Sequence, residues 1–299
     1  MTVAIHTEGL TKFYGKERGI VDLDLDVDQG EVFGYLGPNG AGKTTTIRLL
    51  LDLLRPTRGT SRVLGKHPYF DGVGVRSDIG YLPGELALYG NLSGVQMLTY
   101  IANLRKMNDL GDAPQVAERL ELDLSRQIGD LSSGNKQKVG LVQAFMHHPK
   151  VLILDEPTGG LDPLMQQEFY RLVHEAKEDG RTVFLSSHVL SEVERIADRV
   201  GIIREGKMVV VEELDTLKAR APRRLDLHFA SPIPAAAFEA LPNVEDVSVD
   251  DAVVSCRVVG SVHELIKTAA RFEVTNVVSH EADLEELFLQ YYRGEADAS

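Results

Sequence analysis

The sequence has no tryptophan and a single cysteine, Cys256, among 299 residues. One cysteine excludes an intrachain disulfide, so we expect a reducing compartment. No apolar run approaches the roughly 20 residues that span a bilayer. The first ten residues also lack the charged start and apolar run of a signal peptide. We therefore expect a cytoplasmic chain that does not cross a membrane by itself.

Basic side chains are also scarce. Lys and Arg number 32 against 45 Asp and Glu, which gives a net charge of −13 at pH 7. Nucleic acid phosphates and anionic membrane surfaces repel such a chain. We therefore expect no nucleic acid partner, and we expect any membrane contact to pass through a protein partner. Solubility alone also explains the acidity.

Hydrophobic residues make up 43% of the chain, which is enough for an ordinary buried core. Short apolar runs alternate with helical patterns, and this order predicts an α/β fold with a mainly parallel sheet. Residues 21–27 alternate apolar side chains with aspartates, as in a half-exposed strand. The predicted buried strands are residues 32–36, 151–154 and 182–185, and residues 79–82 are a further short strand candidate. The predicted helices are Lys43 to about Leu54, a helical region over 93–148, and a helix opened by Asp162 and Pro163.

The character of the chain changes after residue 211. Residues 216–224, TLKARAPRR, are basic and irregular, and we predict a linker there. The strand and helix patterns over residues 225–299 predict a small mixed α/β domain. Its last predicted helix places four apolar side chains at helical spacing, Leu284, Leu287, Phe288 and Tyr291. The first domain is then residues 1–215.

A phosphate-binding loop is the clearest motif. Residues 37–44 read GPNGAGKT and fit G-x-x-x-x-G-K-[ST] between a strand and a helix. Glycines let several backbone N–H groups point at one anion, and the helix N-terminus adds partial positive charge. Lys43 supplies a full charge to the β- and γ-phosphates. A plain turn needs fewer glycines and no Gly-Lys-Thr. The predicted nucleotide contacts here are Gly37, Pro38, Asn39, Gly40, Ala41, Gly42, Lys43, Thr44 and Thr45.

Two acids follow the apolar run 151–154, where ligands collect at the carboxyl ends of sheet strands. Asp155 and the Thr44 hydroxyl are the predicted Mg²⁺ ligands. Glu156 is the predicted group that polarises the attacking water, and Lys43 assists catalysis. The alternative is a strand end that carries two solvated acids.

Residues between and beyond these motifs narrow the family. Residues 131–138 read LSSGNKQK, residues 151–162 read VLILDEPTGGLD, and His188 follows. In this order the chain resembles the ABC ATPase family over roughly residues 3–215. The resemblance implies a P-loop NTPase fold of ABC ATPase type, with a mainly parallel sheet, an antiparallel β subdomain and a helical signature subdomain. The small α/β domain follows it.

The same resemblance implies roles for several residues. Tyr14 resembles the aromatic that stacks on adenine, and His188 resembles the switch histidine that holds the γ-phosphate beside Glu156. Ser132 and Gly134 resemble the signature contacts to the γ-phosphate, and Gly160-Leu161-Asp162 resembles the D-loop, so Asp162 joins the nucleotide contacts. The implied assembly is a head-to-tail dimer with a second copy that sandwiches two ATP molecules with Mg²⁺.

The GNKQKVGLVQA run and the small last domain resemble ATPase subunits of multidrug and antibiotic-resistance exporters. In such proteins the permease is a separate chain, so the resemblance implies a peripheral position at the cytoplasmic face of the cell membrane. Three positions depart from the family pattern. Ser133 and Asn135 replace the signature's glycine and glutamine, and Gly84 stands where the Q-loop has glutamine. Glu85 is the alternative group for that role.

Two other functions remain open at this point. One is a soluble ABC ATPase that acts on ribosomes or DNA. Ribosome-acting relatives usually carry two ATPase domains, whereas this chain has one set of motifs. DNA-repair relatives insert long coiled coils between the nucleotide motifs, and the separation of Lys43 from Asp155 is too short for one. The other is a regulatory module that holds ATP without hydrolysis, against which Glu156 and His188 argue.

Overall fold

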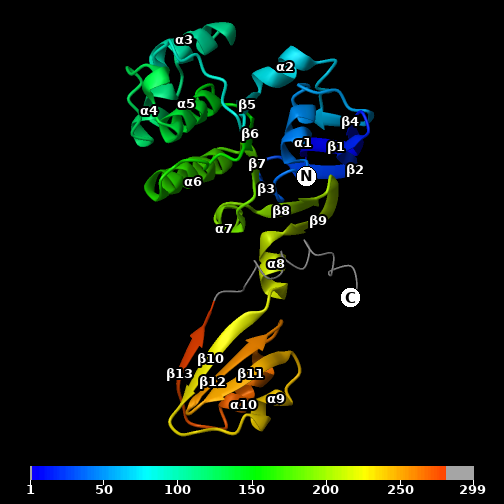
Figure 1. Cartoon of the computed structure of the whole chain (residues 1–299), viewed down its shortest axis with the longest axis vertical. Helices are drawn as coiled ribbons and strands as arrows, with labels where there is room; N and C mark the ends of the chain where they lie inside the picture. The colour runs from blue at the N-terminus through cyan, green and yellow to red at the C-terminus, as the bar shows by residue number, and fades with distance from the viewer. Residues whose placement is uncertain (1, 281–299) are drawn as a thin grey trace. The chain divides into compact units, whose positions relative to one another are not determined.

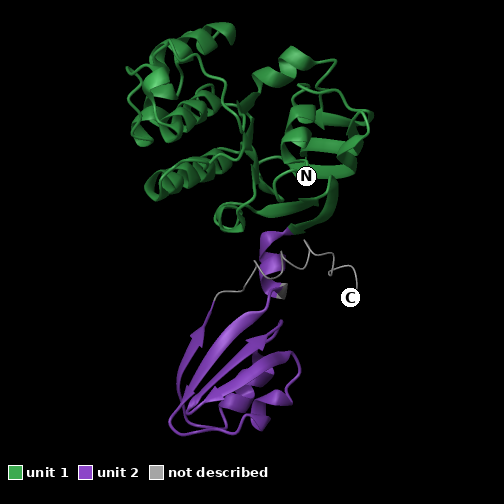
Figure 2. Ribbon diagram, viewed as in Figure 1, with its two compact units in different colours: residues 1–212 green, residues 213–299 purple. Residues whose placement is uncertain are grey.

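The computed structural model describes residues 2–280, and the chain divides into two compact units, residues 1–212 and 213–299 (Figure 2). The predicted irregular linker over residues 216–224 is wrong. Helix α8 (Leu214–Arg220) and the first residues of strand β10 (Arg223–Phe229) occupy it. Leu214 and Leu217 are buried one helical turn apart, so this short helix has an apolar side that its basic residues obscure in the sequence.

A six-stranded sheet forms the centre of the first unit, in the order β5-β6-β7-β3-β8-β9 (Figure 1). The pairs β5–β6, β6–β7, β7–β3 and β3–β8 are parallel, as predicted. Both β3 and β6 are buried at every position, because parallel sheets are covered on both faces. The strands are β3 (Val32–Leu36), β5 (Ile79–Leu82), β6 (Val151–Asp155), β7 (Thr182–Ser187), β8 (Arg199–Arg204) and β9 (Lys207–Glu213).

Helices lie around this sheet, and α3, α4 and α5 gather beyond β5 on the side away from α1 (Figure 1). Helix α1 ends earlier than the predicted Leu54, because the chain turns after Leu50 and Asp52 adopts a positive φ of 58°. The helices of this unit are α1 (Lys43–Leu50), α2 (Gly72–Ser77), α3 (Gly94–Leu104), α4 (Ala113–Arg119), η1 (Ile128–Asp130), α5 (Ser133–Phe145), α6 (Pro163–Glu178) and α7 (Leu190–Val193).

A separate three-stranded antiparallel sheet has the order β2-β1-β4. Its strands are β1 (Val3–Tyr14), β2 (Glu17–Asp28) and β4 (Arg58–Val63). The alternation over residues 21–27 holds at Leu23, Leu25 and Val27, which are buried. Val21 is only half-buried because the register shifts at this point and Asp22 has a positive φ of 48°, so Ile20 takes the inward position.

The second unit is a four-stranded antiparallel sheet in the order β11-β12-β10-β13. Its strands and helices follow one another as βαββαβ, the ferredoxin-like arrangement. Leu227, Phe238 and Val254 lie at the centre of its apolar core. The predicted last helix, with Leu284, lies outside the described residues. The elements are β10 (Arg223–Phe229), α9 (Ala236–Glu239), β11 (Val244–Asp250), β12 (Val253–Val258), α10 (His263–Ala269) and β13 (Val274–Ser279).

Within residues 2–280, no helix is both long and apolar enough to cross a membrane.

Candidate functional site

The phosphate loop connects the end of β3 to the start of α1. Gly40 and Gly42 adopt positive φ values of 80° and 112°, a region that L side chains rarely occupy. A Cβ on Gly42 would also lie 2.7 Å from the Cγ2 atom of Ile20. The loop geometry therefore requires glycine at position 42, in agreement with the motif.

Lys43 lies inside this loop with only 6% of its side chain exposed. Its ammonium donates hydrogen bonds to the carbonyl oxygens of Gly37, at 2.6 Å, and Pro38, at 3.3 Å. The Lys43 Nζ atom also lies 3.2 Å from Glu156 Oε1. The Lys43 ammonium, which we expect to contact phosphate, thus points to the centre of the loop. There it pairs with the carboxylate of Glu156, the predicted catalytic group.

Thr44 and Asp155, the predicted metal ligands, are in direct contact. The Thr44 hydroxyl donates to Asp155 Oδ2 at 2.8 Å, and the Ser186 hydroxyl donates to Asp155 Oδ1. Among residues 2–280, no cluster of three or more His, Cys, Asp or Glu side chains is arranged to hold a metal ion. One hydroxyl and one carboxylate fit Mg²⁺, which takes its remaining ligands from water and substrate phosphates.

Glu156 has a strained backbone, with φ at 51°. Such a conformation costs on the order of 1–3 kcal/mol and persists where the surroundings hold it. The Glu156 N–H donates to the carbonyl and the hydroxyl of Ser186, each at 3.2 Å. The Gln137 side chain donates to the Glu156 carbonyl, also at 3.2 Å. The sequence reasoning gave Gln137 no role, although this polar side chain belongs to the run 131–138 that resembles the signature.

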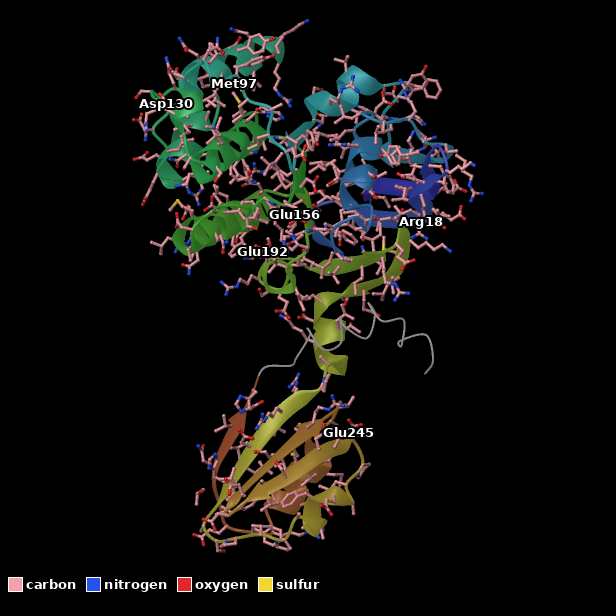
Figure 3. All side chains as sticks on the ribbon, viewed as in Figure 1. Arg18, Met97, Asp130, Glu156, Glu192 and Glu245 are labelled. Atoms are coloured by element: carbon pink, nitrogen blue, oxygen red, sulfur yellow. The ribbon has the colours of Figure 1, made fainter. Side chains whose placement is uncertain are left out.

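His188 and Glu156 are adjacent. The His188 Nδ1 atom lies 2.8 Å from Glu156 Oε2, and Figure 3 shows Glu156 at the carboxyl end of β6. The side chains are 52% and 27% exposed, so both reach solvent at this edge of the sheet. The structure thus brings Lys43, Glu156 and His188 together. The Glu156 carboxylate contacts the Lys43 ammonium through one oxygen and the His188 ring through the other.

Gly84 faces Asp155. A Cβ at this position would lie 3.1 Å from Asp155 Oδ2, so a longer side chain here would reach the metal ligands. Glu85, the alternative, is exposed. Tyr81 on β5 is a neighbour that the sequence reasoning missed. Burial, followed by the negative charge of Asp155, raises the pKa of Tyr81 to about 12, so its hydroxyl stays protonated.

Tyr14 lies at the entrance of the loop. Its hydroxyl is 3.3 Å from the Thr45 hydroxyl, and 44% of the residue is exposed. The Lys12 ammonium stands 5.6 Å from the centre of the ring. An exposed ring beside the first turn of α1 is available for stacking on a base.

The signature and D-loop residues lie against one another. The Ser132 hydroxyl accepts a hydrogen bond from the Asn135 N–H at 3.3 Å and caps α5. A Cβ on Gly134 would lie 2.4 Å from the Gly160 carbonyl oxygen, so only glycine fits this approach. Asp162 caps α6 and accepts from the N–H groups of Leu164 and Met165. Contacts of Ser132, Gly134 and Asp162 with nucleotide stay predictions.

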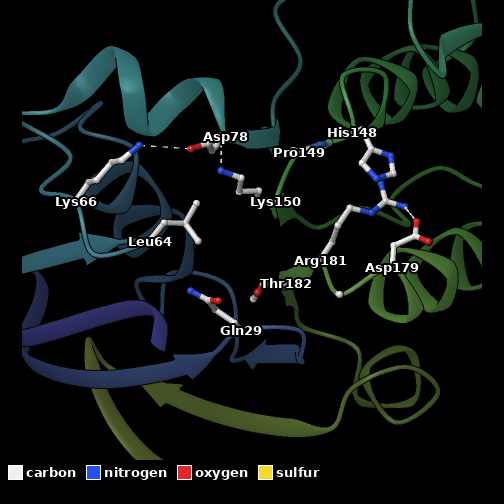
Figure 4. A pocket seen from close by; sticks show the side chains of 11 residues that line it. Gln29, Leu64, Lys66, Asp78, His148, Pro149, Lys150, Asp179, Arg181 and Thr182 are labelled. Atoms are coloured by element: carbon white, nitrogen blue, oxygen red, sulfur yellow. Dashed lines mark hydrogen bonds and ion pairs between the residues drawn. The ribbon is translucent and has the colours of Figure 1, made fainter. Parts of the chain in front are cut away.

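A cavity of about 460 Å³ lies at the opposite, amino-terminal ends of β6 and β7 (Figure 4). Asp78 pairs there with Lys66 at 3.5 Å and Lys150 at 3.4 Å, and Arg181 pairs with Asp179 at 2.8 Å. These charges are neutralised within the cavity wall. None of the predicted site residues lines it, so the chemistry of the sheet is concentrated at the carboxyl edge.

Comparisons with known proteins agree with this geometry. Residues 20–159 match the ABC transporter family. The chain is 39% identical to the bacitracin transport ATP-binding protein BcrA of Bacillus licheniformis, over 77% of this chain and 76% of the relative. It is 34% identical to the BcrA protein of Enterococcus faecalis, over 98% of each chain, so the similarity includes the second unit.

Among solved structures, the chain resembles the dimeric structure of the bacterial ABC transporter cassette MJ0796. The TM-score is 0.65 at 22% identity, over 70% of this chain and 98% of that chain. This likeness confirms the predicted fold class, a mainly parallel sheet with an antiparallel sheet and a helical region beside it.

Proposed function

This chain belongs to the ATP-binding proteins of ABC transporters, and we propose that it drives export of an antibiotic-like or lipophilic compound through a separate membrane permease. Membership of the family makes the chain an ATP hydrolase. The observation that carries the proposal for this site is the direct contact of Glu156 with Lys43 and with His188. A base of this kind must reach both the phosphate and the attacking water.

The proposed roles follow from the contacts. Lys43 exchanges Glu156 for the β- and γ-phosphates of ATP, and this exchange leaves the carboxylate free to polarise water. His188 orients the γ-phosphate and the water beside Glu156. Thr44 and Asp155 hold Mg²⁺, which neutralises charge on the phosphates when it is bound. Tyr14 stacks on the adenine.

A second copy of the chain completes each site in our proposal. Ser132 and Gly134 lie against the D-loop of their own chain, and in a head-to-tail pair they contact the γ-phosphate held by the partner. The N–H groups at the start of α5 suit an anion. The dimeric structure of the similar cassette MJ0796 supports this arrangement.

The export role and the partner rest on the relatives. Both BcrA proteins are bacitracin transport ATP-binding proteins, and one matches this chain over 98% of its length. We propose that residues 1–215 form the ATPase domain, that residues 225–299 form an accessory domain, and that a permease holds the chain at the cytoplasmic face of the membrane. The alternative, action on ribosomes or DNA, has no support among these relatives, and the charge of −13 opposes it.

The test is an affinity purification of the tagged chain from detergent-solubilised membranes of its native host, followed by mass spectrometry. We expect a polytopic membrane protein in about equal amount, together with Mg²⁺-dependent ATP hydrolysis by the complex. Recovery of only soluble partners, such as ribosomal proteins, would contradict the transport role while it leaves the ATPase intact. A parallel purification of the Lys207→Ala variant, changed at an exposed residue of β9, controls for effects of the tag and of substitution.

A further inference from the structure

Glu192 lies on α7, shortly after His188, and no sequence motif gives it a role. Its carboxylate accepts two hydrogen bonds, one from a residue five positions earlier and one from a segment that is distant in the sequence. The Thr158 hydroxyl donates to Oε1 at 2.6 Å, and the Ser187 hydroxyl donates to Oε2 at 2.7 Å. Figure 3 labels both Glu192 and Glu156 in the first unit. One side chain therefore joins two segments of the site.

These two partners flank the reacting groups. Ser187 directly precedes His188, and Thr158 closely follows Glu156. Ser187 is 0% exposed and Thr158 is 4% exposed. Water therefore has little access to either hydroxyl. Loss of the Glu192 carboxylate would leave the buried Thr158 hydroxyl without its acceptor, and Ser187 would keep only its longer bond, at 3.3 Å, to the Val189 carbonyl. Hydrogen bonds to an ionised carboxylate are also shorter and stronger than neutral ones.

We propose that Glu192 is a positioning residue for ATP hydrolysis. Its carboxylate fixes the segments that carry Glu156 and His188, and so maintains the 2.8 Å contact between their side chains. This inference rests on the proposed function, because it assigns a role within the same reaction. Glu192 touches neither Glu156 nor His188 through its carboxylate hydrogen bonds, so it acts through Thr158 and Ser187.

The backbone of Glu156 explains why such a brace is needed. A positive φ at a non-glycine residue persists only where the surroundings hold the turn. Gln137 holds the Glu156 carbonyl, and Glu192 holds Thr158 on the other side of the turn. The Thr158 carbonyl in turn accepts from the Leu161 N–H at 3.0 Å. The brace therefore supports both the catalytic turn and the D-loop that follows it.

The experiment compares Glu192→Ala and Glu192→Gln in the full-length chain. For each variant, ATP affinity, kcat and KM for Mg²⁺-dependent hydrolysis, and the thermal midpoint are measured. We expect Glu192→Ala to lower kcat roughly tenfold to hundredfold, because small displacements of reacting groups have such effects. ATP affinity stays nearly unchanged, because the phosphate loop is intact. Glu192→Gln restores part of kcat, since its amide oxygen still accepts one hydroxyl.

Glu168→Gln is the matched control. Glu168 on α6 is a half-buried carboxylate. It pairs with Arg119 and, at 2.8 Å, with Arg171, and neither pair includes Glu156. Its loss lowers the thermal midpoint and leaves kcat unchanged. A double-mutant cycle adds a second measure. Glu192→Ala and Thr158→Val remove the same hydrogen bond, so their effects on kcat combine to less than the product of the two.

The outcomes separate the two claims. Hydrolysis by the wild type together with normal kcat in Glu192→Ala would overturn the positioning role and leave the proposed function in place. ATP binding without Mg²⁺-dependent hydrolysis by the wild type would overturn both. Independent effects of Glu192→Ala and Thr158→Val on kcat would also overturn the positioning role. If Glu192→Ala does not fold, a normal kcat in Thr158→Val would overturn it instead.

Discussion

The two units use their sheets in different ways. The parallel sheet of the first unit is buried on both faces, and strands such as β3 and β6 have no exposed position. Its polar chemistry is therefore confined to the strand ends, where Asp155 ends β6, Glu156 follows it and His188 follows β7. The antiparallel sheet of the second unit has one apolar face, and its polar groups spread over the other face. On β12, for example, Val254 and Cys256 are buried and Ser255 is half-exposed.

This difference shows where function can be concentrated in the chain. In a doubly covered parallel sheet, charged groups gather at the strand ends, where they are brought within hydrogen-bond distance of one another. In a one-sided antiparallel sheet they pair with cross-strand neighbours instead. Asp226 of β10 pairs with Ser255 and His280 in this way. We therefore expect substitutions in the first unit to act on ATP and those in the second to act on stability.

Loss of the catalytic base has the largest expected effect. Glu156→Gln keeps the shape of the side chain but removes its charge, so water is no longer polarised while the phosphate contacts of Lys43 remain. We expect hydrolysis to fall roughly 10²- to 10⁴-fold and an ATP-bound dimer to accumulate. Phosphate release and light scattering after size-exclusion chromatography measure the two effects.

Glu178→Gln, an exposed change at the end of α6, is the control and retains normal turnover. Normal turnover in Glu156→Gln would contradict the catalytic assignment. It would also remove the chemical contrast between the two units, because the strand-end acids would then be no more functional than the paired acids of the second sheet.

Lys43→Ala has the next largest effect. The Lys43 ammonium is buried and directed by loop carbonyls into the anion site. Its removal deletes a full charge from the phosphate contacts, and we expect ATP affinity to fall about hundredfold or more, which corresponds to about 3 kcal/mol. Equilibrium binding of a fluorescent ATP analogue measures this. Lys207→Ala keeps wild-type affinity; equal affinity in both variants would sink the phosphate-loop assignment.

Much of the first unit was predictable from local sequence. Glycine spacing specifies the phosphate loop, and buried apolar runs place Asp155 and Glu156 at a strand end. The missing parts depend on distant contacts. Gln137 and Glu192 act only because folding brings them to the Glu156 turn. No sequence pattern around Glu192 marks its role, since one of its two hydroxyl partners, Thr158, lies in a distant segment.

The boundary between the units was predicted less well. Basic residues suggested an irregular linker over 216–224, but Leu214 and Leu217 form the buried side of α8. Two leucines in seven residues are too weak a signal for a helix. Similarly, the register shift in β2 moves Val21 out of the core, and cross-strand pairing rather than local alternation determines this shift.

Phe238→Ala tests the comparison of the two units by disrupting the apolar core of the second unit. Phe238 is fully buried and packs beside Phe229 and Phe272, with ring centres 6.0 and 6.3 Å away. We expect the second unit to lose about 3 kcal/mol of stability through the transfer and cavity costs. Urea unfolding measures this, and ATP affinity of the folded protein at low temperature stays at the wild-type value. A matched loss of ATP affinity would show that the second unit supports the nucleotide site.

Ser255→Ala has the smallest expected effect. The Ser255 hydroxyl donates to Asp226 Oδ1 at 2.6 Å, and this bond, followed by His280, lowers the pKa of Asp226. A lowered carboxyl pKa contributes stability above its ordinary value near 3.8, and that contribution is lost as the pH falls through the folded-state pKa. Ser255→Ala therefore costs about 1 kcal/mol or less at pH 7, and the difference from wild type shrinks in acid.

Urea unfolding at pH 7 and in acid measures this difference, with Ser248→Ala, an exposed cross-strand neighbour, as the control. Both variants hydrolyse ATP at the wild-type rate if the polar face only stabilises its own sheet. A slower rate in Ser255→Ala alone would mean that this face acts on the ATPase. The second unit would then be a regulator whose signal passes through Asp226, and the contrast between a chemical and a structural sheet would no longer hold.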